Sequence, residues 1–403
     1  MLDLEAVQAA RDRIDDVARH TPLDYSHTFS EMTGAEVHLK QEVFQRTGAF
    51  KIRGATNRIR TLTDDEQSAG VVTASAGNHA QGVALAAAKS DVDAKIVMPE
   101  DAPISKIEAT RDYGAEVVLH GEHYNEAAER AHEIEAEEDR YYLHAFDDWK
   151  VMAGQGTIGL EIVEDLPEVD TVVVPIGGGG LISGISTAVK AQHPDARVVG
   201  VHPEQAAAAA QSLQKGEIQV LDEVETIADG LATRHIGEKP FEVIQERVDE
   251  VVTVPEDEIA VALLLLLERA KTLTEGAGAI SLAALLSGQV EVDPGEVVVP
   301  ALCGGNIDVN FLTTVLMRAL VERGRYLKLR TVLADRPGAL DEFLDIVSAY
   351  QANIYAIQHD RTSRDIAMDA TEVEIDLETR GEDHVEELLA AMRDAGFEVE
   401  RLV

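Results

Sequence analysis

Short apolar segments alternate with amphipathic segments through most of this 403-residue chain, and this alternation limits the possible folds more than any other feature. The apolar segments are rich in β-branched residues, as buried strands are. They include residues 71–74, 95–99, 116–120, 171–176, 197–202 and 297–302. Repeated strand–helix units predict an α/β fold in which helices cover both faces of parallel sheets.

The pattern changes near residue 324. The following sequence predicts a strand, a helix, two strands, a helix and a strand, at residues 326–333, 339–350, 353–358, 370–377, 384–395 and 397–401. This βαββαβ order is typical of the ferredoxin-like arrangement. We therefore expect two domains, residues 1–323 and residues 325–403.

One lysine, Lys51, lies in the segment Phe-Lys-Ile-Arg-Gly-Ala at residues 50–55, where a strand pattern gives way to a helical one. A lysine held there against a planar ligand, with Phe50 covering one side, has what a Schiff-base lysine needs: a lowered pKa and a fixed approach to an aldehyde carbon. A lysine that opens a helix is more often a solvated surface residue. The assignment therefore depends on binders of phosphate, ring and carboxylate elsewhere in the chain.

Four consecutive glycines, Gly177, Gly178, Gly179 and Gly180, follow the apolar segment at residues 171–176 and precede Leu181 and a helical pattern. Bare backbone N–H groups at the start of a helix can surround an anion, so the segment predicts a phosphate cradle. A plain glycine turn is the alternative. The ending Gly-Lys-Ser/Thr of a nucleoside-triphosphate loop and the spaced glycines of a dinucleotide site are both missing.

Two further strand-to-helix turns carry polar groups. Residues 75–82 read Ser-Ala-Gly-Asn-His-Ala-Gln-Gly and offer donors to a carboxylate and a ring hydroxyl, although Ser75 or Asn78 could simply cap a helix. Residues 303–306 read Cys-Gly-Gly-Asn, where Cys303 could equally be a buried core thiol.

In this order, the four motifs closely resemble the fold-type II pyridoxal-phosphate (PLP) enzymes, and within them the threonine/serine dehydratases. Stretches 146–148, 154–157 and 227–230 match too, and the resemblance spans residues 1 to about 323. It implies a two-lobed, tryptophan synthase β-like catalytic domain with twisted parallel sheets, whose small lobe is inserted at about residues 40–145.

The resemblance also implies roles for single residues. Lys51 would hold PLP covalently and then take the substrate Cα proton. The implied cofactor contacts are Phe50, Lys51, Asn78, Gly177, Gly178, Gly179, Gly180, Leu181, Gly230, Glu275 and Cys303. The implied substrate contacts are Ser75, Ala76, Gly77, Asn78 and His79. For His79, a purely structural role is an equal alternative.

The implied reaction is β-elimination of L-threonine to 2-oxobutanoate and ammonia, with L-serine giving pyruvate, in isoleucine biosynthesis or threonine catabolism. A thiol at Cys303 cannot keep the pyridine nitrogen protonated as a carboxylate would, which favours expulsion of the β-hydroxyl.

Three alternative functions are disfavoured by single residues. A serine racemase needs a second acid/base where this chain has Ala76. Cysteine synthases have threonine in place of His79. A non-catalytic amino-acid sensor is opposed by Lys51 and the glycine segment.

Residues 335–340, Asp-Arg-Pro-Gly-Ala-Leu, join the first strand of the C-terminal segment to its helix, and this resembles an ACT domain. In that family the turn lies where subunits pair and small amino acids bind. The resemblance implies a homo-oligomer, dimer or tetramer, and an allosteric effector site at Asp335, Pro337, Gly338, Ala339 and Leu340. A purely structural dimerisation domain is the alternative.

The net charge is −39, from 74 acidic and 35 basic residues. Residues 325–403 hold only 18 of the acidic and 9 of the basic side chains, so the excess is spread over both segments. Spread acidity with few lysines predicts a halophilic protein in a high-salt cytoplasm, where salt screens self-repulsion. An acidic protein from ordinary salt is the alternative. The charge argues against nucleic acid or an anionic membrane as partner.

The sequence also predicts that the chain has no membrane span, secretory signal, internal disulfide or bound metal ion. No apolar run reaches membrane length, and the acidic N-terminus lacks the features of a secretory signal. One cysteine excludes an internal disulfide. Related enzymes often bind a cation through a glutamate and an aspartate at positions where this chain has His202 and Ala208, so we expect no metal site there.

Overall fold

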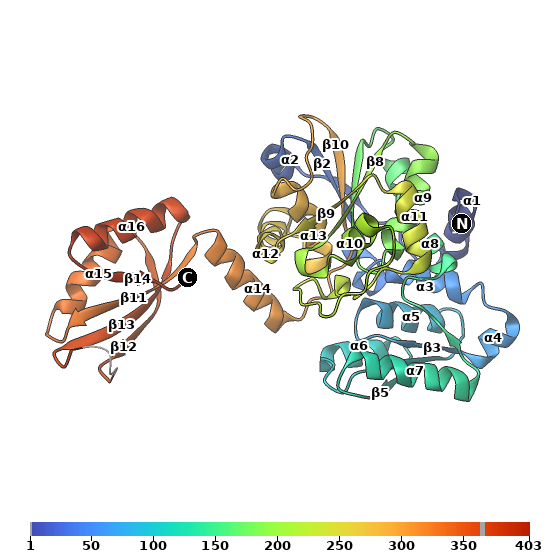
Figure 1. Ribbon diagram of the computed structural model, residues 1–403, viewed down its shortest axis with the longest axis horizontal. Helices are drawn as coiled ribbons and strands as arrows, with labels where there is room; N and C mark the ends of the chain where they lie inside the picture. Colours follow the sequence, from blue (N-terminus) through green and yellow to red (C-terminus); the bar gives the residue numbers. More distant parts are fainter. Residues whose placement is uncertain (1, 363–366) are drawn as a thin grey trace. The chain divides into compact units, whose positions relative to one another are not determined.

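The computed structural model describes residues 2–362 and 367–403. They divide into two compact units, Met1–Asp308 and Val309–Val403 (Figure 1). The division precedes helix α14 (Val309–Glu322), which groups with the second unit, whereas the change of sequence pattern follows that helix.

A six-stranded sheet forms the larger part of the first unit. Its strands, in spatial order, are β1 (Leu23–Tyr25), β2 (Glu36–Gln41), β10 (Val297–Leu302), β7 (Thr171–Pro175), β8 (Arg197–Pro203) and β9 (Glu250–Val254). Only the β1–β2 pair is antiparallel, while β2, β10, β7, β8 and β9 run parallel. The central strands β7 and β8 are almost wholly buried, as strands covered on both faces are.

A second, fully parallel sheet lies between β2 and β7 in the chain. Its strands, in spatial order, are β5 (Glu116–Leu119), β4 (Ala94–Met98), β3 (Val71–Ala74) and β6 (Tyr141–Tyr142). Val71 packs in the same core as helices α3 and α5, whereas the next residue, Val72, packs with Ala131 and Ile134 of α7. Alternate residues of one strand thus face helices on opposite sides of the sheet.

Helices connect the strands of both sheets. They are α1 (Leu4–Ile14), α2 (His27–Thr33), α3 (Lys51–Ile59), α4 (Asp64–Ala69), α5 (Asn78–Ala88), α6 (Ile104–Asp112), α7 (Tyr124–Glu138), α8 (Trp149–Asp165), α9 (Gly180–Gln192), α10 (Ala208–Lys215), α11 (Glu238–Arg247), α12 (Glu256–Leu265) and α13 (Gly276–Leu286). Short helical turns are η1 (Glu42–Phe44), η2 (Arg46–Gly48), η3 (Glu204–Ala206) and η4 (Asp229–Leu231). Helix α12 continues as a π-helix, Leu266–Ala270.

Helix α8 packs between α3 and α9 at very close range. A β-carbon added to Gly154 would lie 2.6 Å from the carbonyl oxygen of Arg53, and one added to Gly184 of α9 would lie 2.3 Å from that of Met152. Both obstacles are backbone atoms, which cannot move aside as a flexible side chain does. These glycines therefore let the backbones touch, and they fix α3 against α8.

The second unit is a four-stranded antiparallel sheet covered on one face. The strand order is β12 (Asn353–Asp360), β13 (Ala370–Glu378), β11 (Tyr326–Ala334) and β14 (Val399–Arg401). Helices α15 (Ala339–Ala349) and α16 (Glu382–Asp394) pack on the face that carries Leu329 and Ile375. On β11 and β13, the alternate residues Lys328 and Glu374 form an ion pair at 3.0 Å.

The predicted elements of both segments are confirmed, with ends that differ by a few residues. The strand–helix alternation does produce parallel sheets, and the C-terminal order is βαββαβ. Within the described part of the chain, no helix is long and apolar enough to cross a membrane.

Candidate active site

Loops that follow four parallel strands surround one cavity of about 770 Å³ in the first unit. Strands β2, β10 and β7 are neighbours in the large sheet, and β3 belongs to the small one. Because the carboxyl ends of neighbouring parallel strands share one edge, the motifs after β2, β10 and β7 meet there, and the motif after β3 lines the same cavity from the small sheet. The cavity wall includes Phe50, Lys51, Ser75, Ala76, Gly77, Asn78, His79, Gly177, Gly178, Gly179, Gly180, Leu181, Gly230, Glu275 and Cys303. Every cofactor and substrate residue expected from the sequence therefore lines a single cavity.

Lys51 is the first residue of helix α3, and its side chain forms part of the cavity wall beside Phe50. Its Nζ donates to the carbonyl oxygen of Ala145 over 3.2 Å and lies 5.1 Å from the centre of the Phe50 ring. Burial lowers the pKa of Lys51 to about 8, although Cys303 and Glu275 act in the opposite direction. The amine is thus far more available as a nucleophile or base near neutral pH than an ordinary lysine.

The glycine segment between β7 and α9 has no room for side chains. A β-carbon on Gly178 would lie 2.4 Å from the ring of Phe146, and one on Gly180 would lie 2.9 Å from the same residue. Gly179 has φ of 91°, which glycine adopts without strain. The segment thus leaves backbone N–H groups bare at the start of a 13-residue helix, as a phosphate group requires.

Asn78 is the first residue of α5 and lies in a chain of side-chain hydrogen bonds. Its Nδ2 donates to Glu275 Oε1 over 2.5 Å, and its Oδ1 accepts from Asn306 Nδ2 over 2.8 Å. Asn306 also donates to the carbonyl oxygen of Thr47 over 2.6 Å. One N–H of the Asn78 amide is thus donated to Glu275 and its oxygen accepts from Asn306, so the second N–H is the remaining donor of this side chain.

Cys303 follows β10 and is buried. Its Sγ donates to the carbonyl oxygen of Ala277 over 3.1 Å. Burial and the neighbouring Glu275 raise the pKa of this thiol well above its ordinary value. Cys303 is therefore a neutral thiol near neutral pH, and it adds no charge to the cavity.

His79 is buried, and its Nε2 lies 3.1 Å from the carbonyl oxygen of Leu143. Burial, and then the charge of Lys51, lower the pKa of His79 to about 3. The ring is therefore neutral, with Nε2–H held by the backbone and Nδ1 left as an acceptor.

Six further polar or aromatic residues of the cavity wall have no role predicted from the sequence. They are Lys106, Tyr124, His144, Phe146, Asp229 and His235. His144 Nδ1 accepts from the backbone N–H groups of Phe146 and Asp147, so its Nε2 carries the proton. The stretches 146–148 and 227–230 did match the family, but nothing in their local sequence indicated which groups would face the cavity.

Among the described residues, no three His, Cys, Asp or Glu side chains are arranged to hold a metal ion. His202 is buried at the end of β8, with Nδ1 3.2 Å from the carbonyl oxygen of Pro203. Its Nε2 lies 3.4 Å from the backbone nitrogen of Ala210. Burial lowers the pKa of His202, so this imidazole is a neutral link between β8 and α10.

A family model for pyridoxal-phosphate-dependent enzymes matches residues 14–304. The chain belongs to this family. It is 48% identical over 402 residues to an L-threonine ammonia-lyase of Geobacter sulfurreducens, with all of both chains covered.

Solved structures agree with this membership. A threonine deaminase from Solanum lycopersicum matches with TM-score 0.76 and 38% identity, over 78% of this chain and 92% of that one. A maize serine racemase matches with TM-score 0.75 and 36% identity, over 80% of this chain and 98% of that one.

The lowered pKa of Lys51 predicts the pH dependence of cofactor capture. Only the neutral amine attacks an aldehyde, so the rate at which cofactor-free protein captures PLP should rise with pH and level off above a midpoint of about 8. Stopped-flow absorbance across the pH range measures it. A midpoint near the ordinary lysine value of about 10.4 would show that the cavity does not lower this pKa.

Proposed function

We propose that this protein is a threonine ammonia-lyase, which converts L-threonine to 2-oxobutanoate and ammonia and accepts L-serine to give pyruvate. The observation that carries the proposal is the cavity in which a lysine of lowered pKa, a bare glycine segment and a neutral thiol meet. Full-length similarity to the Geobacter L-threonine ammonia-lyase supports the choice of substrate.

The residues of the cavity fit PLP. Gly177, Gly178, Gly179 and Gly180 would hold its phosphate through backbone N–H groups, which no side chain covers, at the start of α9. Asn78 would donate to the ring hydroxyl, and Cys303 would face the pyridine nitrogen. Bound there, PLP supplies the electron sink for carbanion chemistry.

Lys51 would be the base that removes the proton from the substrate Cα atom. With a pKa of about 8, its amine can both bind an aldehyde and afterwards take the proton from the substrate Cα atom. Its contact with the carbonyl oxygen of Ala145 holds Nζ on one side of the cavity. Ser75, Gly77, Asn78 and His79 would bind the substrate carboxylate from the loop that begins α5.

The neutral thiol at Cys303 favours elimination over reprotonation. A thiol that donates to a carbonyl oxygen and stays uncharged cannot stabilise a protonated pyridine as a carboxylate does. Loss of the β-hydroxyl then competes well against return of the proton. Ala76 lines the cavity but has no group that moves a proton, which disfavours a racemase despite the similarity to the maize enzyme.

For the second unit we propose an ACT-type regulatory or oligomerisation domain. The βαββαβ order with sheet order β12-β13-β11-β14 supports it, as does the Asp335–Leu340 turn at the start of α15. Gly338 has φ of 89°, which favours glycine, and a β-carbon added there would have no atom within 4 Å, so a ligand has room to approach the backbone. Ala339 is buried and Leu340 packs against the core, which leaves mainly backbone groups and Asp335 to bind an effector.

The proposed activity depends on Lys51. We expect Lys51→Ala to abolish ammonia release from L-threonine and the absorbance of bound PLP, because no other group replaces its covalent role. Lys106→Ala removes a second positive charge from the same cavity wall and serves as the control, with cofactor absorbance retained. A folded Lys51→Ala protein with most of its turnover would refute the assignment.

The spread negative charge predicts halophilic behaviour, which we propose as adaptation to a high-salt cytoplasm. The melting temperature should fall as salt is lowered from about 1 M to about 0.1 M, because the screening length grows from about 3 Å to about 10 Å. At about pH 5, near the sequence pI of about 4.5, the same change in salt should have a smaller effect. A melting temperature that is flat in salt at neutral pH would contradict this.

The effector hypothesis predicts that isoleucine or valine, downstream products of 2-oxobutanoate, bind to the second unit. Calorimetric titration into the full enzyme should show binding that weakens in the Asp335→Ala variant. By linkage, substrate should change the affinity for the effector as much as effector changes that for substrate. No binding, together with unchanged kinetics, would leave this unit an oligomerisation element.

A further inference from the structure

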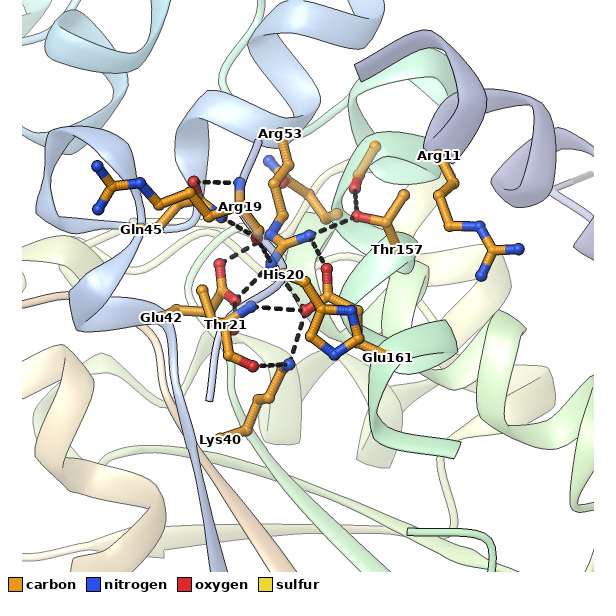
Figure 2. Close-up of polar contacts among 12 residues, drawn as sticks. Arg11, Arg19, His20, Thr21, Lys40, Glu42, Gln45, Arg53, Thr157 and Glu161 are labelled. Atoms are coloured by element: carbon orange, nitrogen blue, oxygen red, sulfur yellow. Dashed lines mark hydrogen bonds and ion pairs between the residues drawn. The ribbon is translucent and has the colours of Figure 1, made fainter. Parts of the chain in front are cut away.

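A buried cluster of four charged side chains joins three elements of the first unit (Figure 2). It consists of Lys40 on β2, Glu42 just after it, Arg53 on the first turn of α3 and Glu161 on α8. Arg53, Glu42 and Lys40 are at most 1% exposed, and Glu161 is 5% exposed. Two positive and two negative charges balance, as a cluster buried from water requires.

Arg53 makes the central contacts. Its Nε and Nη2 donate to the two carboxylate oxygens of Glu42, each over 2.8 Å. Its Nη1 donates to Glu161 Oε1 over 2.6 Å and to Thr157 Oγ1 over 3.0 Å. Lys40 Nζ donates to the other oxygen of Glu161 over 2.6 Å. Burial alone would raise the pKa of Glu161, but Arg53 and Lys40 lower it, so this carboxylate stays charged.

The paired residues Glu42 and Arg53 flank the loop of residues 43–50, which leads from β2 to α3. Lys51 is the first residue of α3, directly after this loop and two residues before Arg53. Within the loop, Thr47 has φ of 64° and Gly48 has φ of 68°, and the first is an unfavourable conformation for a β-branched residue. The loop also meets the Cys303 segment, because the backbone N–H of Phe50 donates to the carbonyl oxygen of Cys303 over 3.1 Å. A strained loop keeps one conformation only when its surroundings hold it.

We propose that the bidentate Arg53–Glu42 pair, which we call the clasp, closes this loop and positions Lys51 relative to the Cys303 loop and the cofactor. Arg53 and Glu42 touch neither substrate nor cofactor in this account, so they act as positioning residues. Lysine cannot replace Arg53 here, since a single ammonium group cannot match both carboxylate oxygens in the fork geometry.

The test titrates cofactor-free protein with PLP and records the dissociation constant, the circular dichroism band of the bound cofactor and kcat per bound cofactor. Arg53→Lys keeps the charge but loses the fork. We expect weaker binding, an altered dichroism band and a fall in kcat of about 10- to 100-fold, because a small displacement of a reacting group is costly. A role in folding alone would lower the melting temperature and leave these readouts unchanged.

Arg60 offers a matched control. It follows α3 and forms a bidentate pair with Asp16, whose side chain is 70% exposed, so Arg60→Lys should leave all three readouts unchanged. Glu42→Gln keeps the shape of the clasp, removes one charge and serves as the second test variant. Its effects should have the same direction as those of Arg53→Lys.

Each outcome is decisive. Wild-type affinity, dichroism and kcat in folded Arg53→Lys and Glu42→Gln would overturn the positioning role, and failure of both variants to fold would reduce the clasp to a folding element. If Arg53→Lys alone fails to fold, the PLP affinity, dichroism band and kcat of Glu42→Gln test the positioning role. The inference rests on PLP binding at Lys51, so a parent protein that binds no PLP would refute the proposed function instead.

Discussion

The buried pairing of Arg53 with Glu42 and Glu161 is the interaction on which the catalytic unit depends. It joins the residue after β2, the first turn of α3 and the C-terminal part of α8, and Arg53 also donates to the backbone of Arg19 before β1. Breaking one partner of a buried ion pair typically costs about 3–5 kcal/mol, because the other charge is left uncompensated. A rearrangement of these elements would therefore leave a buried charge unpaired, and Lys51 lies two residues from the central Arg53.

Close backbone packing gives the cluster its rigid surroundings. Glycines where α8 crosses α3 and α9 let the helix backbones approach more closely than side chains would allow. At the α3 crossing, Gln155 Oε1 accepts from the backbone N–H of Gly54 over 3.1 Å. Gln155 also lines the cavity. The same helix therefore carries part of the cavity wall and a carboxylate of the cluster, so the packing of the core and the position of the reactive lysine are linked.

Much of the fold and of the site could be predicted from the sequence because their signals are local. Apolar strands, the glycine run and the Lys51 segment each lie within a few consecutive residues, and the parallel arrangement brings their ends together. The charged cluster could not be predicted, because Lys40, Glu42, Arg53 and Glu161 are dispersed and look like ordinary surface residues in a very acidic chain. The Asn306–Asn78–Glu275 hydrogen bonds and the packing of Phe146 against Gly178 likewise depend on contacts between distant loops.

The central claim is that the cofactor is bound at Lys51, in a cavity that has a second lysine, Lys106, in its wall. Borohydride reduction of the PLP-loaded protein fixes the cofactor to the amine that holds it, and peptide mass spectrometry then identifies that residue. The account predicts a pyridoxyl group on Lys51 and on no other lysine. Labelling of Lys106, or of no lysine in the cavity, would contradict it.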